Sequence, residues 1–500
     1  MAKPDDAQRE TIAFLADPQT HGGPVDRIDT HCSILFLTQE HAYKLKRAIR
    51  LPYLDYSTVT RRRAMCEAEL QLNRRTASDL YEKVACISRD RDGHPRFDVS
   101  GEALDWVVVM RRFPAGAAFD HMADHGALTE GHVGALATAI ARFHGAAEVH
   151  KDAGGAAAMA KVVQNNEEAF RAVKGGVFSE DDVTALSRDT RIALAAGAAL
   201  LDQRRQAGKV RQCHGDLHLR NVVLWHEVPT PFDCIEFDMD LARIDVLYDL
   251  AFLLMDLEYR GLRRLANVAL NTYLAAAGDW DGLALLPLFL SMRAAIRAHV
   301  SGTAGDRAAA SSYLELARRF LTPAPAELAA IGGLSGTGKS SVSRAIAPTL
   351  GRAPGAVVLR TDVLRKEIAG VPPTQRLPPE AYTKENSGRV YDLLNRRSRQ
   401  ILGSGHSVLA DAVFADPAER RAIEGAAQSA GIFQGIWLEA SAELLEARVA
   451  QRRGDASDAT PEVVRAQNRY DLGDVTWRRV DASGTEAETV TRVKAALGLD

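Results

Sequence analysis

The sequence predicts two domains of different architecture: an α+β domain in which strands come first and helices follow, then an α/β domain with a parallel sheet. Three observations predict this division. The chain has 500 residues, which is more than one hydrophobic core usually organises. A Pro/Ala stretch at Leu321–Glu327 interrupts the helical pattern, and after it apolar strands alternate with helices, as in βαβ units. The predicted boundaries are residues 1–320 for the first domain, 321–326 for the linker and 327–500 for the second.

The composition is that of an ordinary soluble globular protein, with 46% hydrophobic, 25% charged and 6% aromatic residues. A net charge of −3 gives no overall attraction to nucleic acid or to anionic membrane. Nucleic acid is therefore an unlikely partner, and no membrane partner is expected. The five cysteines are widely spaced and form no C-x-x-C pair, which argues against a disulfide framework and a zinc site. The start of the chain shows no secretory signal, so we expect a cytoplasmic protein.

The first domain is predicted to have two lobes. Residues 25–112 predict a small lobe rich in strands, and residues 113–320 predict a larger, mainly helical lobe. A helical pattern covers Thr58–Thr76. The β-like runs of the small lobe are Cys32–Thr38, His41–Arg47 and Ala103–Met110.

A stretch with loop character, Cys213–Asn221 (CHGDLHLRN), interrupts the helices of the larger lobe. It places Asp216 and Asn221 five positions apart. In the catalytic loops of kinases, an Asp at this spacing orients and deprotonates the attacking hydroxyl, and the Asn holds a metal ion. Gly215 stands where protein kinases carry an Arg, which points toward enzymes that act on small molecules.

The segment HGDLHLRN resembles the catalytic loop of aminoglycoside phosphotransferases and choline kinases, and the resemblance extends over about residues 25–320. It implies a bilobal, protein-kinase-like α+β fold that uses ATP and Mg²⁺. It also implies a metal-binding acid at the end of the next strand, which we predict over Phe232–Asp238. The spacing to Ile244–Asp249 suggests that Glu236 takes the metal position, with Asp238 two residues on and on the same face of the strand.

The same resemblance implies a Lys–Glu pair that positions the ATP phosphates. Lys44 and Lys46 share one face of a predicted strand, and the predicted helix offers Glu67 and Glu69. We choose Lys44 and Glu69, with Lys46 and Glu67 as the other candidates. No G-x-G-x-x-G precedes Lys44.

Three further residues of the first domain are candidates for supporting roles. Asp249 is expected to hydrogen-bond the catalytic loop or to cap a helix. Arg293 and Arg297 are four positions apart and share one helical face in the region where related enzymes bind their acceptors. Two arginines suit an anionic acceptor, although ion-paired or solvated surface charge explains them equally well.

The strongest signal in the chain is a phosphate-binding loop, Gly333–Ser340 (GLSGTGKS), which fits G-x-x-x-x-G-K-[ST] between a predicted strand and a helix. The backbone N–H groups of such a loop surround phosphate oxygens, and the helix N-terminus adds a favourable dipole. Lys339 reaches the terminal phosphates and the Ser340 hydroxyl ligates Mg²⁺. The candidate nucleotide-binding residues are Gly333, Ser335, Gly336, Thr337, Gly338, Lys339 and Ser340.

Two carboxylates are predicted at strand ends near this loop. Asp411 ends an apolar strand at the position where such folds place a carboxylate near the metal. Asp362 is predicted to end the strand AVVLRTD, where it can accept a proton from a substrate hydroxyl. Arg365, one helical turn beyond, is a candidate for holding an anionic group of the substrate. The alternative is an Asp that caps a helix, with a surface Arg.

Three arginines follow a strand-like IWLEA. Arg448, Arg452 and Arg453 are positioned as a closing lid would need them to stabilise transition-state charge. The alternative is solvated surface charge.

With these residues, the segment from about 327 to 500 resembles the P-loop kinases of the zeta-toxin, gluconate-kinase and polynucleotide-kinase type. The resemblance implies that Asp362 is the catalytic base and that the three arginines form the lid. The whole chain resembles bacterial fusions of an aminoglycoside phosphotransferase with an ATP-binding domain. We therefore expect a bifunctional ATP- and Mg²⁺-dependent kinase acting on hydroxyls of small molecules. Two alternatives are an N-terminal pseudokinase that senses a ligand and regulates the P-loop kinase, and a nucleic-acid 5′-hydroxyl kinase in the C-terminal half.

Overall fold

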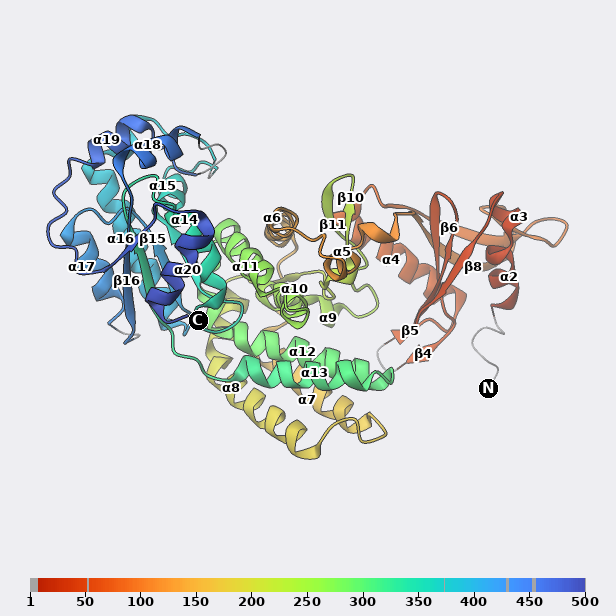
Figure 1. Cartoon of the computed structure of the whole chain (residues 1–500). Coiled ribbons are helices and arrows are strands. Elements are labelled where there is room, and N and C mark those ends of the chain that lie inside the picture. The colour runs from red at the N-terminus through yellow and green to blue at the C-terminus, as the bar shows by residue number, and fades with distance from the viewer. Residues whose placement is uncertain (1–7, 52–53, 373, 429–430, 452–455, 500) are drawn as a thin grey trace. The chain divides into compact units, whose positions relative to one another are not determined.

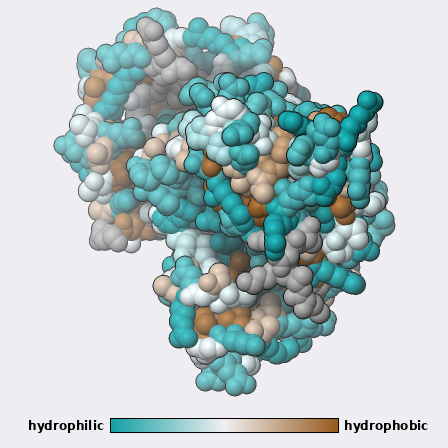
Figure 2. Space-filling model, turned by 90° about the vertical axis from the view of Figure 1, so that its right-hand side faces the viewer, coloured by the Kyte–Doolittle hydropathy of each residue, from teal (hydrophilic) through white to brown (hydrophobic). Residues whose placement is uncertain are grey.

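The computed structural model describes residues 8–51, 54–372, 374–428, 431–451 and 456–499 (Figure 1). The chain forms two compact units. The first comprises Met1–Asn165 and Leu194–Asp256, and the second comprises Asn166–Ala193 and Leu257–Asp500. The helices between Leu257 and Leu321 therefore pack within the second unit, although they precede the predicted linker. On the face shown in Figure 2, hydrophilic side chains predominate and hydrophobic ones are scattered among them.

The first unit begins with an antiparallel six-stranded sheet in the order β1-β2-β3-β8-β6-β7. One core cluster joins helix α2 to the sheet through residues such as Leu15, Phe36 and Val107, all fully buried. A second cluster contains residues of helix α4, whose N-cap Thr58 accepts a hydrogen bond from Arg61 N. The three predicted strands and the predicted helix of this lobe are confirmed. The elements are α2 (Arg9–Ala16), α3 (Pro18–His21), β1 (Asp26–Asp29), β2 (Ser33–Leu37), β3 (His41–Lys46), β4 (Arg50–Leu51), β5 (Leu54–Asp55), α4 (Val59–Ala77), β6 (Tyr81–Arg89), β7 (Pro95–Phe97) and β8 (Ala103–Arg111).

Helices and two short β-pairs complete the first unit, and the catalytic-loop motif lies between β9 and β10. β10 and β11 form a hairpin, and β9 pairs with β12. The predicted strand over Phe232–Asp238 is wrong, because β11 ends at Pro231 and Asp238 is the N-cap of α9. The elements are η1 (Ala115–Ala117), α5 (Phe119–Asp124), α6 (Glu130–Ala146), α7 (Gly155–Ala172), α8 (Glu180–Gln206), β9 (Val210–Gln212), η2 (Leu219–Asn221), β10 (Val222–Trp225), β11 (Val228–Pro231), α9 (Met239–Ala242), β12 (Arg243–Asp245) and α10 (Val246–Tyr259); α7, α8 and α10 contribute residues to both units.

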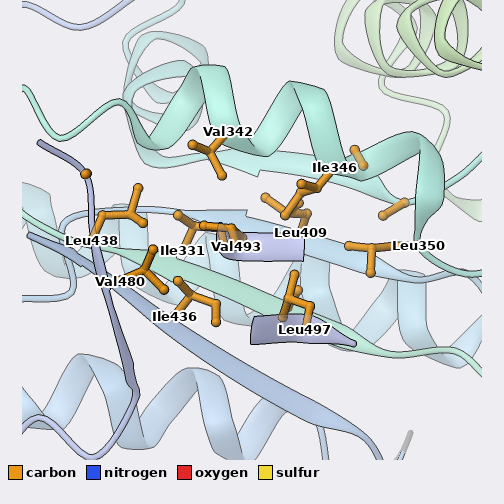
Figure 3. Packing of buried hydrophobic residues seen from close by; sticks show 14 residues of the cluster. Ile331, Val342, Ile346, Leu350, Leu409, Ile436, Leu438, Val480, Val493 and Leu497 are labelled. Atoms are coloured by element: carbon orange, nitrogen blue, oxygen red, sulfur yellow. The ribbon is translucent and has the colours of Figure 1, made fainter. Parts of the chain in front are cut away.

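The second unit contains a parallel five-stranded sheet in the order β14-β15-β13-β16-β17. Val342 and Ile346 of α14 and Leu497 of α20 pack with Ile331 and Leu409 of the sheet (Figure 3). The parallel α/β architecture expected of this half is confirmed. The elements are β13 (Leu328–Gly332), α14 (Lys339–Ile346), η4 (Ala347–Thr349), β14 (Val357–Arg360), α15 (Thr361–Ile368), η5 (Pro379–Tyr382), α16 (Lys384–Gly403), β15 (Val408–Asp411), α17 (Pro417–Ala426), β16 (Phe433–Glu439), α18 (Ala442–Gln451), α19 (Pro461–Gln467), β17 (Arg478–Asp481) and α20 (Glu486–Leu497).

The helices α11 (Arg263–Ala277), α12 (Leu286–Thr303) and α13 (Arg307–Leu321) and the turn η3 (Asp281–Leu285) also belong to the second unit. The stretch Asp281–Thr303 is long and apolar enough to cross a membrane, but 72% of its apolar window is buried inside the fold. That burial is the behaviour of a core helix.

Candidate active sites

In the first unit, the catalytic-loop residues Asp216 and Asn221 are in direct contact. The Asn221 amide donates hydrogen bonds to the Asp216 carboxylate at 2.9 Å and to the Asp216 backbone carbonyl at 3.0 Å. Asn221 is buried, whereas 37% of the Asp216 side chain is exposed. Gly215 has a φ of +85°, and a Cβ there would lie 3.0 Å from the Leu241 carbonyl oxygen. The glycine is therefore required by the loop, and the carboxylate that it precedes is open to solvent.

Asp249, in the first turn of α10, anchors this loop. Its two carboxylate oxygens accept the backbone N–H groups of His214 at 3.0 Å and Gly215 at 2.8 Å. His144 Nε2 lies 3.1 Å from the same carboxylate. The expected role of Asp249 in holding the loop is confirmed. Asp256 lies seven residues after Asp249 in α10 and accepts the backbone N–H of Leu219 at 2.9 Å. It is a second anchor of the loop, and the sequence did not reveal it.

The chosen pair Lys44 and Glu69 forms a salt bridge of 2.8 Å between Nζ and Oε1. Lys46 also contacts Glu69, at 2.6 Å through Oε2. Glu67 instead lies on the surface and pairs with Arg63 at 2.9 Å. Burial would raise the pKa of Glu69, but the charges of Lys44 and Lys46 lower it to about 2.

Asp233, which the sequence reasoning missed, completes this cluster. Its carboxylate lies 2.5 Å from Lys44 Nζ, and 40% of its side chain is exposed. Asp233 follows β11 by two residues and has a φ of +61°, a left-handed conformation that non-glycine residues adopt rarely. The signal that could have identified it is its position in the sequence, since it is an acid twelve residues after Asn221 and two residues after the end of β11.

Glu236 and Asp238, the predicted metal ligands, make other contacts. The Glu236 carboxylate accepts hydrogen bonds from Lys46 Nζ at 2.5 Å and from the Tyr56 hydroxyl at 2.6 Å. The Asp238 carboxylate accepts the backbone N–H of Asp240 at 2.9 Å and caps α9. Of the acids after β11, the structure thus brings Asp233 to Lys44.

The phosphate loop of the second unit lies between β13 and α14, as the motif requires. Gly333, Gly336 and Gly338 all have φ values in the left-handed region. A Cβ on Gly336 would come within 2.7 Å of the Leu445 carbonyl oxygen, so the loop depends on its glycines. Lys339 Nζ donates to the carbonyl oxygens of Gly333 at 2.8 Å and Leu334 at 3.0 Å.

The two candidate metal ligands of the second unit, Ser340 and Asp411, are hydrogen-bonded to each other. The Ser340 hydroxyl donates to the Asp411 carboxylate at 2.7 Å, and Asp411 ends β15 as predicted. Arg360 Nε lies 3.3 Å from the same carboxylate. A hydroxyl and a carboxylate are oxygen ligands of the kind that Mg²⁺ prefers.

Asp362 does not end a strand. β14 ends at Arg360, and Asp362 lies in the first turn of α15. Burial raises the pKa of Asp362, and the negative charge of Asp411 raises it further, against the lowering effects of Arg360 and Lys339. Asp362 therefore lies near Lys339 of the phosphate loop and near Arg360 and Asp411 at the ends of β14 and β15.

A cavity of about 230 Å³ lies beside the phosphate loop and is lined by Thr337, Gly338, Ser341, Val342, Arg448, Gly484, Thr485, Glu486 and Thr489. The Arg448 guanidinium donates to the carbonyl oxygens of Ala482 at 2.8 Å and Gly484 at 2.7 Å. Arg448 thus forms part of the cavity wall. The other two predicted lid arginines, Arg452 and Arg453, lie outside the described residues.

The candidate substrate arginines make protein contacts of their own. Arg365 donates to the Ala381 carbonyl at 2.7 Å and lies 4.8 Å from the centre of the Tyr382 ring. Arg293 is buried in α12, and Arg297 lies 5.7 Å from the centre of the Tyr313 ring.

Next to Arg365 in the sequence, Lys366 takes part in a hydrogen-bonded cluster around Asp458 that the sequence did not reveal. Asp458 accepts hydrogen bonds from Lys366 Nζ at 2.6 Å, from Leu377 N at 3.0 Å and from the Tyr382 hydroxyl. Burial would raise the pKa of Asp458, but the bonds from Lys366 and Tyr382 hold it below its ordinary value. Lys366 is 1% exposed. Through Asp458 it connects α15 to the segment that contains Leu377 and Tyr382.

Comparison with known proteins also finds two domains in the chain, although the first match extends beyond Asp256 into the second structural unit. A family model described as the phosphotransferase enzyme family matches residues 94–286, and one described as an AAA domain matches residues 328–471. The chain is 30% identical over 491 residues to uncharacterized protein Mb2027c of Mycobacterium bovis and to uncharacterized proteins MT2060 and Rv2004c of Mycobacterium tuberculosis. Each match covers 95% of this chain and 96% of the relative.

Two solved structures are similar to parts of the chain. A choline/ethanolamine kinase family protein from Mesorhizobium loti is 16% identical, with a TM-score of 0.40, and the match covers 63% of this chain and 96% of that chain. A gluconokinase from Sinorhizobium meliloti is 24% identical, with a TM-score of 0.26, and the match covers 35% of this chain and 92% of that chain.

Proposed function

This chain belongs to the family of two-domain proteins that includes the three mycobacterial relatives, and we propose that it is a bifunctional ATP-dependent kinase. Its phosphotransferase domain and its P-loop kinase domain both imply kinase-type phosphoryl transfer. In the proposal each half binds its own Mg²⁺-ATP and transfers the γ-phosphate to a hydroxyl of a small molecule in the cytoplasm. The observation that supports it is that each unit holds a separate cluster of carboxylates, a lysine and further polar groups of the kind that such a transfer needs.

In the first unit, Asp216 is the catalytic base and Lys44 binds the ATP phosphates. The exposed carboxylate of Asp216, held by the Asn221 amide at 2.9 Å, accepts the proton of the acceptor hydroxyl. Glu69 holds Lys44 at 2.8 Å. Burial would lower the pKa of Lys44, but Asp233 and Glu69 raise it well above its ordinary value, so this lysine stays charged.

Asn221 and Asp233 are the proposed metal ligands of the first unit, in place of Glu236 and Asp238. Asp233 is the half-exposed acid beside Lys44, whereas Glu236 is engaged by Lys46 and Tyr56. A bound Mg²⁺ neutralises charge that develops on the transferred phosphoryl group.

In the second unit, the backbone of Gly333–Ser340 and the Lys339 ammonium bind the phosphates, and Ser340 and Asp411 hold Mg²⁺. Asp362 is the proposed base. Its raised pKa brings it nearer to working pH, which suits proton transfer from a hydroxyl. The cavity walled by Arg448 adjoins the loop at Thr337 and Gly338 and offers a place for the nucleoside.

The test follows γ-labelled phosphate from ATP into a fractionated pool of small cytoplasmic metabolites. It compares the wild type with Asp216→Asn and Lys339→Ala. We expect each substitution to abolish a different labelled product, because the two transfers use different sites. If labelling depends on Lys339 alone, the first unit is not a kinase and the sensor role for it is favoured. If labelling depends on neither residue, both assignments fail.

A further inference from the structure

Beneath the proposed nucleotide site of the first unit lies a second lysine that the chemistry above does not use. Lys46 is 0% exposed, and its ammonium lies 2.6 Å from Glu69 Oε2 and 2.5 Å from Glu236 Oε1. Burying a charge is costly unless it is paired and hydrogen-bonded. Burial would lower the pKa of Lys46, but Glu236 and Glu69 raise it well above its ordinary value, so Lys46 is a permanent buried cation.

Lys44 and Lys46 each donate a hydrogen bond to a different oxygen of the Glu69 carboxylate. Lys44 takes Oε1 at 2.8 Å and Lys46 takes Oε2 at 2.6 Å. With both oxygens engaged, the plane of this carboxylate is fixed. The direction in which Glu69 holds the Lys44 ammonium therefore depends on Lys46.

Lys46 also anchors the segment that carries Asp233. Glu236 follows Asp233 by three residues and is 7% exposed, and it is held by Lys46 and by the Tyr56 hydroxyl at 2.6 Å. Asp233 itself has a left-handed backbone conformation and a half-exposed side chain. A residue in that conformation persists only where its surroundings hold it, and the Glu236 anchor is such a restraint.

We propose that Lys46 is a positioning residue, which holds Glu69 on one side and the Asp233 segment on the other so that Lys44 and Asp233 face the phosphates and the metal. Lys46 itself touches neither. The inference rests on the proposed phosphotransfer in the first unit, and it makes Glu236 an anchor for the metal-binding segment.

The experiment measures ATP affinity with Mg²⁺ and with EDTA, by calorimetry, in the full-length Lys339→Ala variant, so that the first unit supplies the remaining nucleotide site. The readout is the Mg²⁺ enhancement, the ratio of the two affinities. We expect Lys46→Met to lower this ratio by about tenfold or more, since loss of an outer partner of a metal ligand has effects of that size. A merely structural role would change the unfolding temperature and leave the ratio intact.

Lys46→Met leaves Glu236 buried without its cation, so a second variant separates folding from positioning. Lys46→Met/Glu236→Met replaces the buried pair by apolar side chains, which folds tolerate well. We expect the unfolding temperature to return toward that of the parent while the Mg²⁺ enhancement stays low. Recovery of both would overturn the proposal. Tyr56→Phe, which removes a single hydrogen bond to Glu236, is expected to lower the enhancement less.

The matched control is Arg204→Met, which breaks another buried ion pair of the same unit, Arg204 with Asp245 at 2.7 and 2.8 Å. We expect it to lower the unfolding temperature and to keep the Mg²⁺ enhancement. An equal loss in this control overturns the role of Lys46. If the Lys339→Ala parent binds no ATP, the proposed function of the first unit fails as well. If the parent binds ATP with Mg²⁺ enhancement and Lys46→Met does the same, only the role of Lys46 fails.

Discussion

The side-chain carbonyl oxygen of Asn271 on α11 accepts a hydrogen bond from the backbone N–H of Val358 on β14 at 2.7 Å. The amide nitrogen of Asn271 lies 3.3 Å from the Ala356 carbonyl oxygen, which Asn267 also reaches at 3.0 Å. β14 is an edge strand, so these amides satisfy backbone groups that a further strand would otherwise pair. A helix within the part matched by the phosphotransferase family model thus closes the edge of the P-loop kinase sheet.

Replacing Asn271 is expected to loosen that edge. Asn271→Leu leaves the Val358 N–H without its acceptor, at a cost of about 1–3 kcal/mol for an unsatisfied buried group. We expect the Val358 amide to exchange with solvent faster, as measured by hydrogen exchange of the full chain. Asn271→Asp keeps an acceptor for this N–H and serves as the graded control. Equal exchange in all three proteins would show that the side chain does not protect β14.

Asp233 and Asp238 give a second, paired prediction. Asp233→Asn removes the carboxylate beside Lys44, and we expect the phosphotransferase activity of the first unit to fall by about 100-fold or more, as for a group that holds transition-state charge. Asp238→Asn keeps a good N-cap on α9 and is expected to leave the rate within about twofold. The measurement is the initial rate of ATP consumption in the Lys339→Ala background. The opposite order of effects would return the metal role to Asp238.

The pH dependence of the second unit follows from Asp362. A base is active when deprotonated, and burial together with the charge of Asp411 raises the pKa of Asp362. As the pH is lowered, the rate is therefore expected to fall at a pH above the ordinary Asp pKa of about 3.9. Arg360→Met removes a charge that lowers the pKa of Asp362 and should move this fall in rate to still higher pH. The profile is measured in the Asp216→Asn background.

The same measurement includes Asp362→Asn, which should lower the rate by about 10²–10⁴, the usual contribution of a general base. ATP binding should be retained, because the phosphate loop is untouched. A fall in rate that stays at the same pH in Arg360→Met would argue against Asp362 as the titrating group.

Asp249 supplies a stability prediction. Asp249→Ala leaves the backbone N–H groups of His214 and Gly215 without acceptors, and we expect a loss of about 2–4 kcal/mol for two charge-assisted hydrogen bonds. Thermal unfolding of the full chain measures it. Asp240→Ala, an exposed Asp near the same loop, is the control and should change stability by less than about 0.5 kcal/mol. A stable Asp249→Ala protein would mean that the loop holds its shape without this anchor.

Short-range sequence patterns were sufficient to predict the two loops to which we assign phosphate binding and phosphate transfer. The phosphate-binding groups expected of Gly333–Ser340 are consecutive backbone N–H groups and two adjacent side chains. The order of residues in the sequence therefore already specifies their local geometry. The same holds for Asp216 and Asn221, five positions apart and in contact in the structure. The alternation of strands and helices after residue 327 likewise predicted the parallel sheet.

Pairings between distant residues depended on the tertiary structure. Lys44 meets Asp233 across 189 positions of the chain, and which acid after β11 reaches it depends on where that strand ends and on the left-handed turn at Asp233. The placement of Arg448 on two carbonyls and of Asn271 on the edge of β14 depends in the same way on how separate elements pack. Spacing along the chain specifies contacts within one turn or loop, whereas the packing of whole elements decides which distant charges meet.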